Sequence, residues 1–443
     1  MPLSHDYRAT LRLGLPIAIG QLGVIVMGFA DTMMVGRYST SALAAASFAN
    51  ALFNLITYLL LGYSYGLTPL VSSLYGQGRR DEAGGTLLHG LACNVGFALM
   101  LMAAMTGVFF LLPRFGQPAE ILPLVRPYYL CLMVSMLFVA TFNATRQFTD
   151  AVTDTSVGMA AILSGNALNI LGNWLLIYGI GPFPELGLTG AGISTALSRL
   201  YMALFILAAV RFRPRYAAFR RGLRACRLRR PALRRVNAAS LPVSLQMGME
   251  SGAFTVSGIM AGWLGAVDLA TFQVMLTVGT LGFLLYYSFG SSMSIRVAAA
   301  YGQRDWPAVH RASRAGCHIL LAMCALSSLT FLVAGVPIIR CFTQDAAVIA
   351  LAATLIPPLI LYQLGDAMQV CFSNALRGTG HVSPVMWVAF VSYVVVNVPV
   401  AYLFGFVLGM GSMGIFLAFS VGLFTAAVLF WWNFRRALAM DIR

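Results

Sequence analysis

Long apolar segments recur along the whole chain, separated by short stretches that contain Gly, Pro and charged residues. Each segment has about 20 apolar residues, enough for a helix to cross a hydrocarbon core roughly 30 Å thick. The segments do not alternate between apolar and polar residues, as the strands of a transmembrane β-barrel do. The pattern predicts an all-α integral membrane protein with twelve transmembrane helices, near residues 11–35, 43–74, 87–112, 121–145, 156–179, 187–210, 236–260, 268–300, 313–338, 348–375, 383–406 and 411–434.

The composition supports a membrane location, because 59% of the residues are hydrophobic and only 10% are charged. The formal net charge of +15 would suggest a nucleic-acid partner in a soluble protein. Here the basic residues, all of them arginine, lie between the apolar segments, where they determine topology. We therefore expect membrane lipid around the chain, no nucleic acid, and a monomer.

The arginines are distributed unequally between the two sides of the predicted membrane. One side carries the termini and the loops after even-numbered helices, and it holds 24 of the 29 arginines. The other side holds Arg37, Arg114, Arg126 and Arg340, and Arg199 lies within the sixth predicted helix. Shifting the assignment by one helix would remove this asymmetry. The positive-inside rule predicts a bacterial inner-membrane protein with both termini in the cytoplasm.

The chain resembles itself at one offset over the first part of each half, and further along the offset drifts by a few residues. Leu15-Pro16 aligns with Leu241-Pro242, and the same offset aligns Tyr75-Gly76-Gln77 with Tyr301-Gly302-Gln303. Six helices in each half preserve direction, so the repeats must be parallel and related by an axis along the membrane normal. We expect two pseudo-symmetric six-helix lobes with a central cleft, and alternating access by rocking of one lobe against the other.

The predicted boundaries place the first lobe at 1–211, an Arg-rich cytoplasmic linker at 212–235, and the second lobe at 236–443. The stretch from Arg211 to Arg235, which is the linker and the residue before it, carries eleven arginines. They favour an anchor on anionic lipid at the inner face, and a regulatory partner is the alternative.

Three acidic residues lie inside predicted helices among apolar and small residues: Asp31, Glu250 and Asp366. An ionised carboxylate in a low dielectric costs several kcal/mol unless it is paired or binds a cation. Only Arg199 is an intramembrane basic residue, so each acid is expected to take up a proton or a metal ion. Such carboxylates can exchange Na⁺ or H⁺ for an organic cation. Structural carboxylates hydrogen-bonded between helices are the alternative.

Polar residues at helical spacing extend this candidate site. Tyr362 lies one turn before Asp366 on the same helix face, where it either helps to coordinate an ion or packs in the bundle. A polar stripe in the fifth predicted helix can face Asp31 or serve as interhelical hydrogen bonding; it consists of Asn166, Asn169 and Asn173. Two weaker candidates of the same kind are Gln273 and Thr195.

Other chemistry is not indicated. The Gly-x-Gly at Gly76 and Gly78 lacks the Walker pattern, which argues against ATP-driven transport. The seven cysteines form no C-x-x-C pair, and the five histidines are scattered, so neither a disulfide framework nor a zinc site is indicated. We expect no enzyme activity and no cofactor beyond the coupling ion. No removable signal peptide is expected either.

Several short motifs together resemble a known family. They are Leu15-Pro16 through Gln21, Asp31 through Arg37, Leu43-Ala44-Ala45, Pro69 through Arg79, Ser294 through Val297, and Leu376 through Gly380. In this order and spacing, over the whole chain, they resemble the multidrug and toxic compound extrusion (MATE) transporters, and within them the NorM-like branch.

The resemblance implies a twelve-helix fold of two lobes forming a V-shaped cleft, and export of cationic drugs in exchange for Na⁺ or H⁺. It implies that the family's functional acids correspond to Asp31, Glu250 and Asp366, and its tyrosine to Tyr362. Members of the archaeal-type branch carry an additional Asp in the fifth helix, where this chain has Asn173. That departure argues against a proton site wholly in the first lobe.

The sequence therefore predicts a secondary active antiporter of organic cations and drugs, with Glu250 and Asp366 as the Na⁺ candidates. Na⁺ and H⁺ both remain open, because either neutralises a carboxylate. A flippase for a lipid-linked precursor is the alternative, and it predicts a basic cleft for a phosphate-bearing head group. No motif supports a receptor or a membrane enzyme.

Overall fold

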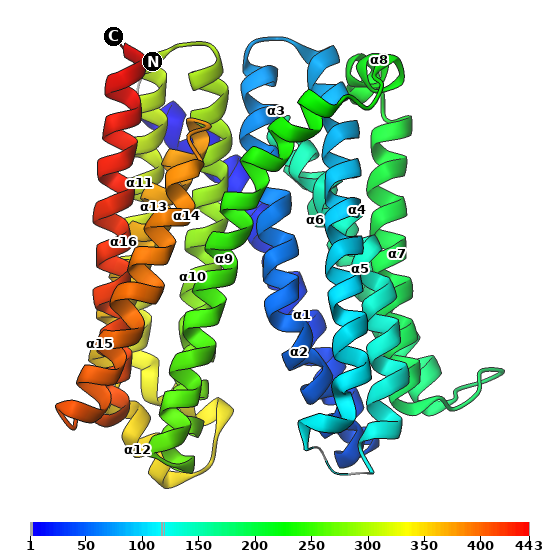
Figure 1. Cartoon of the computed structure of the whole chain (residues 1–443), viewed down its shortest axis with the longest axis vertical. Coiled ribbons are helices and arrows are strands. Elements are labelled where there is room, and N and C mark those ends of the chain that lie inside the picture. The colour runs from blue at the N-terminus through cyan, green and yellow to red at the C-terminus, as the bar shows by residue number, and fades with distance from the viewer. Residues whose placement is uncertain (1–2, 117, 119, 443) are drawn as a thin grey trace. The chain divides into compact units, whose positions relative to one another are not determined.

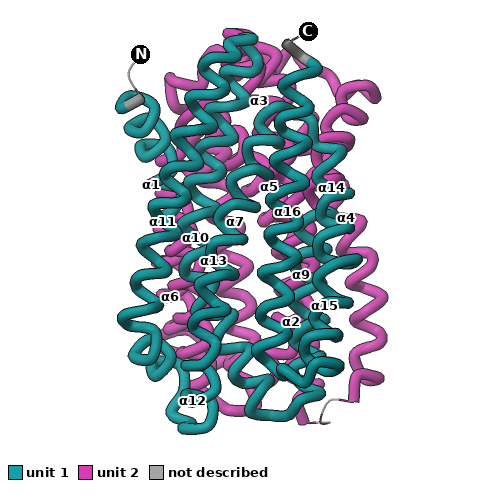
Figure 2. The backbone as a smooth tube through the Cα atoms, turned by 90° about the vertical axis from the view of Figure 1, so that its left-hand side faces the viewer, with its two compact units in different colours: residues 1–18, 245–443 teal, residues 19–244 magenta. Residues whose placement is uncertain are grey.

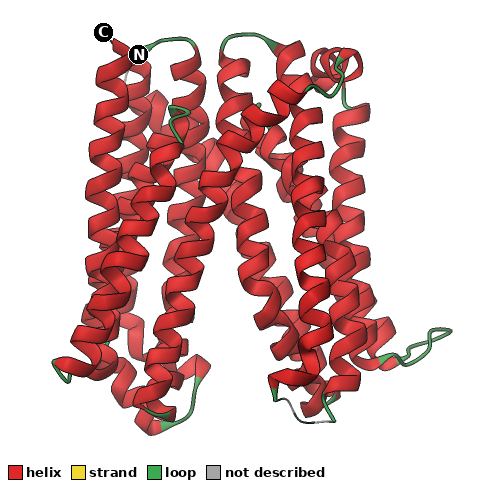
Figure 3. Ribbon diagram, in the orientation of Figure 1, coloured by secondary structure: helices red, strands yellow, loops and turns green. Residues whose placement is uncertain are grey.

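The computed structural model describes residues 3–116, 118 and 120–442, and these are helical apart from short loops and turns (Figures 1 and 3). Lipid offers no partner to backbone N–H and C=O groups, and a helix satisfies them within its own segment. The apolar segments accordingly fold as long helices. The start of α1 (Leu3–Tyr38) and the end of α16 (Gly411–Ile442) lie at the same end of the molecule (Figure 1).

The twelve predicted helices correspond to the observed elements. Among the described residues, ten helical stretches are long and apolar enough to cross a membrane, and one bent pair of helices makes an eleventh. The remaining predicted span is α9 (Arg230–Leu264), which is 35 residues long but carries polar residues such as Gln246 and Glu250. The chain is a multi-pass, all-helical integral membrane protein, as predicted.

The helices form two compact units, shown in different colours in Figure 2. Unit 1 contains residues 1–18 and 245–443, and unit 2 contains residues 19–244. This division differs from the predicted boundaries at the first helix of each half. The beginning of α1 belongs with the helices of the second half, and the beginning of α9 belongs with those of the first.

Polar contacts explain why the beginning of α1 belongs to unit 1. Ser292 donates a hydrogen bond to the backbone carbonyl of Thr10 at 2.8 Å. Arg296 donates to the Thr10 hydroxyl at 2.8 Å and forms an ion pair with Asp6. The sequence placed Asp6 and Arg296 in separate segments, and nothing in their spacing indicated that they would pair.

Unit 2 is a bundle in which α5 packs against α2, α4 and α7, and α7 packs against α6. Its core is built around aromatic residues such as Phe53 and Tyr129, whose ring centroids are 4.8 Å apart. Besides parts of α1 and α9, its elements are α2 (Thr40–Tyr65), α3 (Leu67–Gly76), α4 (Arg80–Leu111), η1 (Leu112–Phe115), α5 (Leu122–Ala151), α6 (Thr155–Tyr178), α7 (Gly187–Phe212), η2 (Pro214–Tyr216) and α8 (Ala217–Ala225).

The second predicted span is interrupted at Gly66, between α2 and α3. A Cβ atom at this position would lie 2.4 Å from the Cα of Ser240 and 2.6 Å from the carbonyl oxygen of Ala239 in α9. Both neighbours are backbone atoms, which cannot move aside as a flexible side chain can. Glycine is therefore required here because the two backbones approach closely.

Unit 1 is centred on α13, which packs against α10, α11 and α16. Besides parts of α1 and α9, its elements are α10 (Ala266–Gly302), α11 (Trp306–Phe342), α12 (Ala346–Thr354), α13 (Ile356–Gly378), α14 (Ser383–Ala389), η3 (Phe390–Asn397), α15 (Val398–Tyr402), η4 (Leu403–Val407) and α16. Both η3 and η4 are π-helical, so the eleventh predicted span is irregularly wound.

The tenth predicted span bends by 53° at Leu355, between α12 and α13. Pro357 and Pro358 follow at once, at positions where a helix start tolerates proline and a helix interior does not. Acidic residues that the sequence placed in loops cap helices in this unit. Asp305 accepts from the backbone N–H of α11, and Asp345 from that of α12.

A disulfide between Cys317 in α11 and Cys371 in α13 corrects one expectation. The sequence indicated no disulfide, because no cysteines lie close together along the chain. The two residues are 54 positions apart, and their Cα atoms come within 5.7 Å because α11 packs against α13. Pairing of this kind depends on helix packing, which spacing alone does not reveal.

Candidate functional site

The first polar cluster lies inside unit 1, where three helical segments bring side chains together. Glu250 projects from α9, Asp366 from α13, and Tyr393 from η3. Glu250 and Asp366 are close enough for their charges to repel each other. The Tyr393 hydroxyl donates a hydrogen bond to Glu250 and accepts one from the Gln369 side chain at 2.9 Å. The structure therefore brings two of the predicted acids together, and Tyr393, which was not predicted from the sequence, bonds to one of them.

The surroundings of Asp366 leave part of its charge without a partner. Its side chain is 1% exposed, and its Oδ2 atom has no hydrogen-bond partner among the described residues. A buried ionised carboxylate in this position is costly, because water is excluded and no donor replaces it. A proton or a cation is the species that would relieve this cost.

One basic residue partly offsets the acid pair. Arg377, at the end of α13, is 7% exposed and donates to the side-chain oxygen of Gln246 at 2.5 Å. Gln246 lies one helical turn before Glu250, and the charge of Arg377 acts on Glu250. The cluster thus contains two carboxylates and one guanidinium, which leaves a net negative charge when both acids are ionised.

The π-helical winding of η3 lies beside this cluster. Tyr393 is 1% exposed, and Asn397 at the end of the same segment is fully buried. Neither polar atom of the Asn397 side chain has a hydrogen-bond partner among the described residues. π-Helical turns occur frequently at functional sites, where they redirect side chains that an α-helix would place elsewhere.

Tyr362 is buried, and an aromatic cluster surrounds it. Its ring centroid lies 6.1 Å from that of Phe416, 6.2 Å from that of Phe419, and 6.5 Å from that of Phe254. The ring therefore packs in the bundle, and it also acts electrostatically on Tyr393. Both roles considered from its spacing are compatible with this position.

The second polar cluster lies inside unit 2 and contains Asp31. The Asn173 side chain donates to Asp31 Oδ1 at 2.5 Å, and its amide lies 3.5 Å from the oxygen of Asn169. Asn169 in turn donates to the Thr195 hydroxyl at 3.4 Å. Asn169 and Asn173 are fully buried, whereas Asp31 is half-buried. The structure thus connects Asp31, two residues of the asparagine stripe, and Thr195.

A basic residue also accompanies Asp31. Arg199 of α7 acts electrostatically on Asp31 and on Tyr128, and it donates to the Ser135 hydroxyl at 2.7 Å. The arginine that the sequence placed alone in the sixth predicted helix therefore serves this cluster. Asp31 has both a donor and a nearby cation, and in this respect it differs from Asp366.

Two predicted residues stand apart from these clusters. Asn166 donates instead to the backbone carbonyl of Gly23 at 2.6 Å, which ties α6 to α1. Gln273 is an exposed residue of α10. Conversely, three residues of the unit 1 cluster were not predicted from the sequence: Tyr393, Gln369 and Arg377. Gln369 follows Asp366 by three residues and was detectable by spacing, whereas no sequence signal indicated that Arg377 turns inward.

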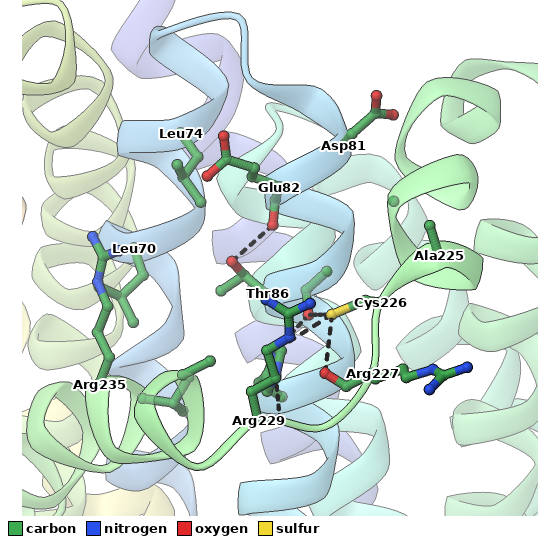
Figure 4. Close-up of a pocket in the computed structure, with 15 residues that line it drawn as sticks. Leu70, Leu74, Asp81, Glu82, Thr86, Ala225, Cys226, Arg227, Arg229 and Arg235 are labelled. Atoms are coloured by element: carbon green, nitrogen blue, oxygen red, sulfur yellow. Dashed lines mark hydrogen bonds between the residues drawn. The ribbon is translucent and has the colours of Figure 1, made fainter.

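The Arg-rich linker forms a separate hollow in unit 2, of about 390 Å³, between α3, α4 and the segment after α8 (Figure 4). His89 Nδ1 donates to a carbonyl of its own helix, and Nε2 accepts from the backbone N–H of Arg229 at 3.3 Å. Arg229, Thr86 and Cys226 all line this hollow (Figure 4). Acidic Glu82 also lines the hollow, so its charge is mixed.

The linker helix α8 is attached by its aromatic side. Phe219 packs against Phe148 with ring centroids 5.5 Å apart, and the arginines of α8 are partly or fully exposed. Tyr216, which precedes α8, donates to Asp154 at 2.8 Å, and burial raises the pKa of this tyrosine. Lipid anchoring and partner binding by the exposed arginines both stay predictions.

Comparison with known proteins places this architecture in a family. The MatE family model matches the chain twice, over residues 16–175 and 242–403. The chain belongs to the MatE family. Both matches start at equivalent positions of the internal repeat, next to Leu15-Pro16 and Leu241-Pro242. The chain is a MATE transporter and not an enzyme.

Individual relatives cover nearly the whole chain. The "Multidrug resistance protein NorM" of Photobacterium profundum is 28% identical over 440 residues, covering 96% of this chain and 95% of the relative. The "Probable multidrug resistance protein NorM" of Pseudomonas putida is 30% identical and covers 98% and 96%. A solved outward-facing multidrug resistance MATE family transporter matches with a TM-score of 0.90 at 21% identity, covering 99% and 97%. This likeness confirms the predicted fold class.

Proposed function

We propose that this MATE transporter is a secondary active antiporter, which exports organic cations and drugs in exchange for Na⁺ or H⁺ by alternating access. Similarity to relatives named for multidrug resistance supports the substrate class. The observation that carries the coupling mechanism is the buried Asp366 carboxylate, which lies beside Glu250 and whose Oδ2 atom has no hydrogen-bond partner in the described part of the chain.

The proposed exchange follows from the charge of this cluster. A coupling cation at Glu250 and Asp366 neutralises carboxylates that the protein leaves incompletely paired, and so does a cationic drug. Because both ligands relieve the same buried charge, binding of one favours release of the other. Carboxylate and hydroxyl oxygens are the ligands that hard cations prefer, which makes Glu250 and Asp366, assisted by Tyr393, the candidate Na⁺ ligands.

We propose a different role for Asp31. Its carboxylate is already served by Asn173 and by the charge of Arg199, so a cation is less strongly required there. We place coupling mainly at Glu250 and Asp366, and a supporting role in substrate or ion binding at Asp31, Asn169, Asn173 and Thr195. Gln273, exposed on α10, is a candidate for substrate contact only.

The proposed orientation has both termini in the cytoplasm of a bacterial cell, with the chain in the inner membrane. It rests on the arginine asymmetry and on the common end at which α1 begins and α16 ends. A flippase for a lipid-linked precursor is less well supported, because a phosphate-bearing head group needs a net positive site. The charged side chains of the unit 1 cluster are two acids and one arginine.

The proposal is tested by drug efflux from intact cells. Drug-sensitive bacteria expressing the protein are loaded with ethidium, and its loss is followed by fluorescence for the wild type, Glu250→Gln and Asp366→Asn. We expect both variants to lose efflux. Glu185→Gln is the matched control, because Glu185 is an exposed acid in a loop. Unchanged efflux in both cluster variants would remove the proposed site.

A further inference from the structure

A second hollow, distinct from the acidic cluster, lies in unit 1 between α11, α13 and α16. Its volume is about 270 Å³. It is near the end of the unit where α11 begins and α16 ends (Figure 1). Four basic residues and three aromatic ones are among those that line it: His310, Arg314, His318, Arg435, Phe372, Trp431 and Phe434.

The charge in this hollow is of one sign. None of the described residues that line it is acidic. Arg314 is exposed and forms no ion pair or hydrogen bond with a described side chain. Arg435 is held with its guanidinium carbon 5.2 Å from the centroid of the Trp431 ring. His318 is fixed by a 2.6 Å hydrogen bond between its Nδ1 and the Tyr7 hydroxyl. An anion is the ligand that would offset the positive charges of Arg314 and Arg435.

The helix faces that carry the basic residues become apolar toward the middle of the membrane. On α11, the face that carries Arg314 continues to Leu321 and Leu329, which are 44% and 58% exposed. On α16, the face that carries Arg435 continues through Trp431 to Val428, which is 61% exposed. A ligand that fits both parts has an anionic head and hydrocarbon chains directed into the bilayer.

We propose that this hollow binds the phosphate of an anionic phospholipid, whose acyl chains lie along the apolar continuation of α11 and α16. Basic pockets between transmembrane helices on the cytoplasmic side are suited to such head groups. In the orientation proposed above, the hollow faces the cytoplasmic leaflet, where anionic lipids attract basic residues. The linker hollow of unit 2 is a weaker candidate because Asp81 and Glu82 line it.

Lipid binding is measured by native mass spectrometry of the purified full-length protein in detergent. Phosphatidylglycerol is titrated against phosphatidylcholine, for the wild type and for the double variant Arg314→Gln/Arg435→Gln. The matched control is Arg436→Gln, which removes the same charge from the adjacent position of α16, outside the hollow. Inorganic phosphate is added as a soluble competitor, which separates recognition of a lipid from recognition of free phosphate.

We expect the wild type to prefer phosphatidylglycerol, and the double variant to bind it roughly 25-fold more weakly, at about fivefold for each arginine. Arg436→Gln should bind as the wild type does. Equal binding by the wild type and the double variant overturns the proposal, and so does complete displacement of the lipid by millimolar phosphate. If the double variant does not fold, Arg314→Gln compared with Arg314→Lys decides, because only the lysine variant should retain binding.

Discussion

Replacing Asp366 by asparagine is predicted to leave the stability of the protein nearly unchanged while removing its stabilisation by the coupling ion. The substitution keeps the shape of the side chain and removes its charge. In the structure Asp366 is 1% exposed, no described residue forms a hydrogen bond with its Oδ2 atom, and the charge of Glu250 repels it. The charge is therefore a source of instability whenever no cation accompanies it.

The expected magnitudes separate this account from a structural one. Breaking a well-formed buried ion pair costs about 3–5 kcal/mol, whereas removing an uncompensated buried charge is neutral or stabilising. A coupling ion present at a hundred times its dissociation constant stabilises the wild type by about 2.7 kcal/mol, and it cannot act in this way on a variant that has lost the site. Asp366→Asn should thus unfold close to the ion-free wild type and respond to neither ion.

The assay is thermal unfolding of purified protein in detergent, followed by tryptophan fluorescence. Wild type and Asp366→Asn are compared in NaCl and in choline chloride at equal ionic strength, each at pH 6 and pH 8. The reasoning is refuted if the difference between the two proteins is the same in all four buffers. It is also refuted if the substitution costs several kcal/mol in every buffer, because Asp366 would then be a structural partner.

Three further substitutions test other parts of the account. Asn173→Leu leaves Asp31 without its hydrogen-bond donor and should lower the free energy of unfolding by about 1–3 kcal/mol, measured as a lower midpoint of thermal unfolding. An unchanged midpoint would contradict the hydrogen bond. Gly66→Leu forces two helix backbones apart and should lower the free energy of unfolding by about 1–3 kcal/mol or more, visible as loss of monodisperse protein in size-exclusion chromatography. Gly96→Leu is the control that should remain monodisperse, because an added Cβ there meets no described atom from another part of the chain within 4 Å. Arg377→Gln removes a positive charge that acts on Glu250, so the half-saturating coupling-ion concentration for efflux should fall by up to about tenfold. A rise in this concentration would show instead that the arginine assists ion binding.

Most of the helices could be predicted from the sequence, because lipid requires every membrane-spanning segment to satisfy its own backbone hydrogen bonds. A span of about 20 apolar residues has few alternatives to a transmembrane helix, and the twelve predicted segments correspond to observed helices. The breaks inside the predicted helices were harder to predict from the sequence. Gly66 is required by an approach of α9 from far along the chain, and the bend at Leu355 was signalled only by Pro357 and Pro358, which the sequence analysis did not use.

The acidic residues of the candidate site could be predicted from the sequence, but the residues that contact them could not. Asp31, Glu250 and Asp366 stood out because few charges occur in apolar helices. Arg377 follows the tenth predicted helix, at a position where an arginine is typical of a cytoplasmic loop. In the structure α13 extends to Gly378, so Arg377 belongs to the helix and its side chain is buried. The disulfide was also missed, because it depends on which helices pack together.

The central claim is that drug export is driven by a cation that neutralises Glu250 and Asp366 in unit 1. It is tested most directly in proteoliposomes that contain the purified protein and a fluorescent organic cation, first under an imposed Na⁺ gradient and then under an imposed pH gradient. The account predicts that one of the two gradients drives transport in the wild type, and that neither does in Asp366→Asn or Glu250→Gln. Transport by these variants at the wild-type rate, or wild-type transport that responds to neither gradient, would contradict it.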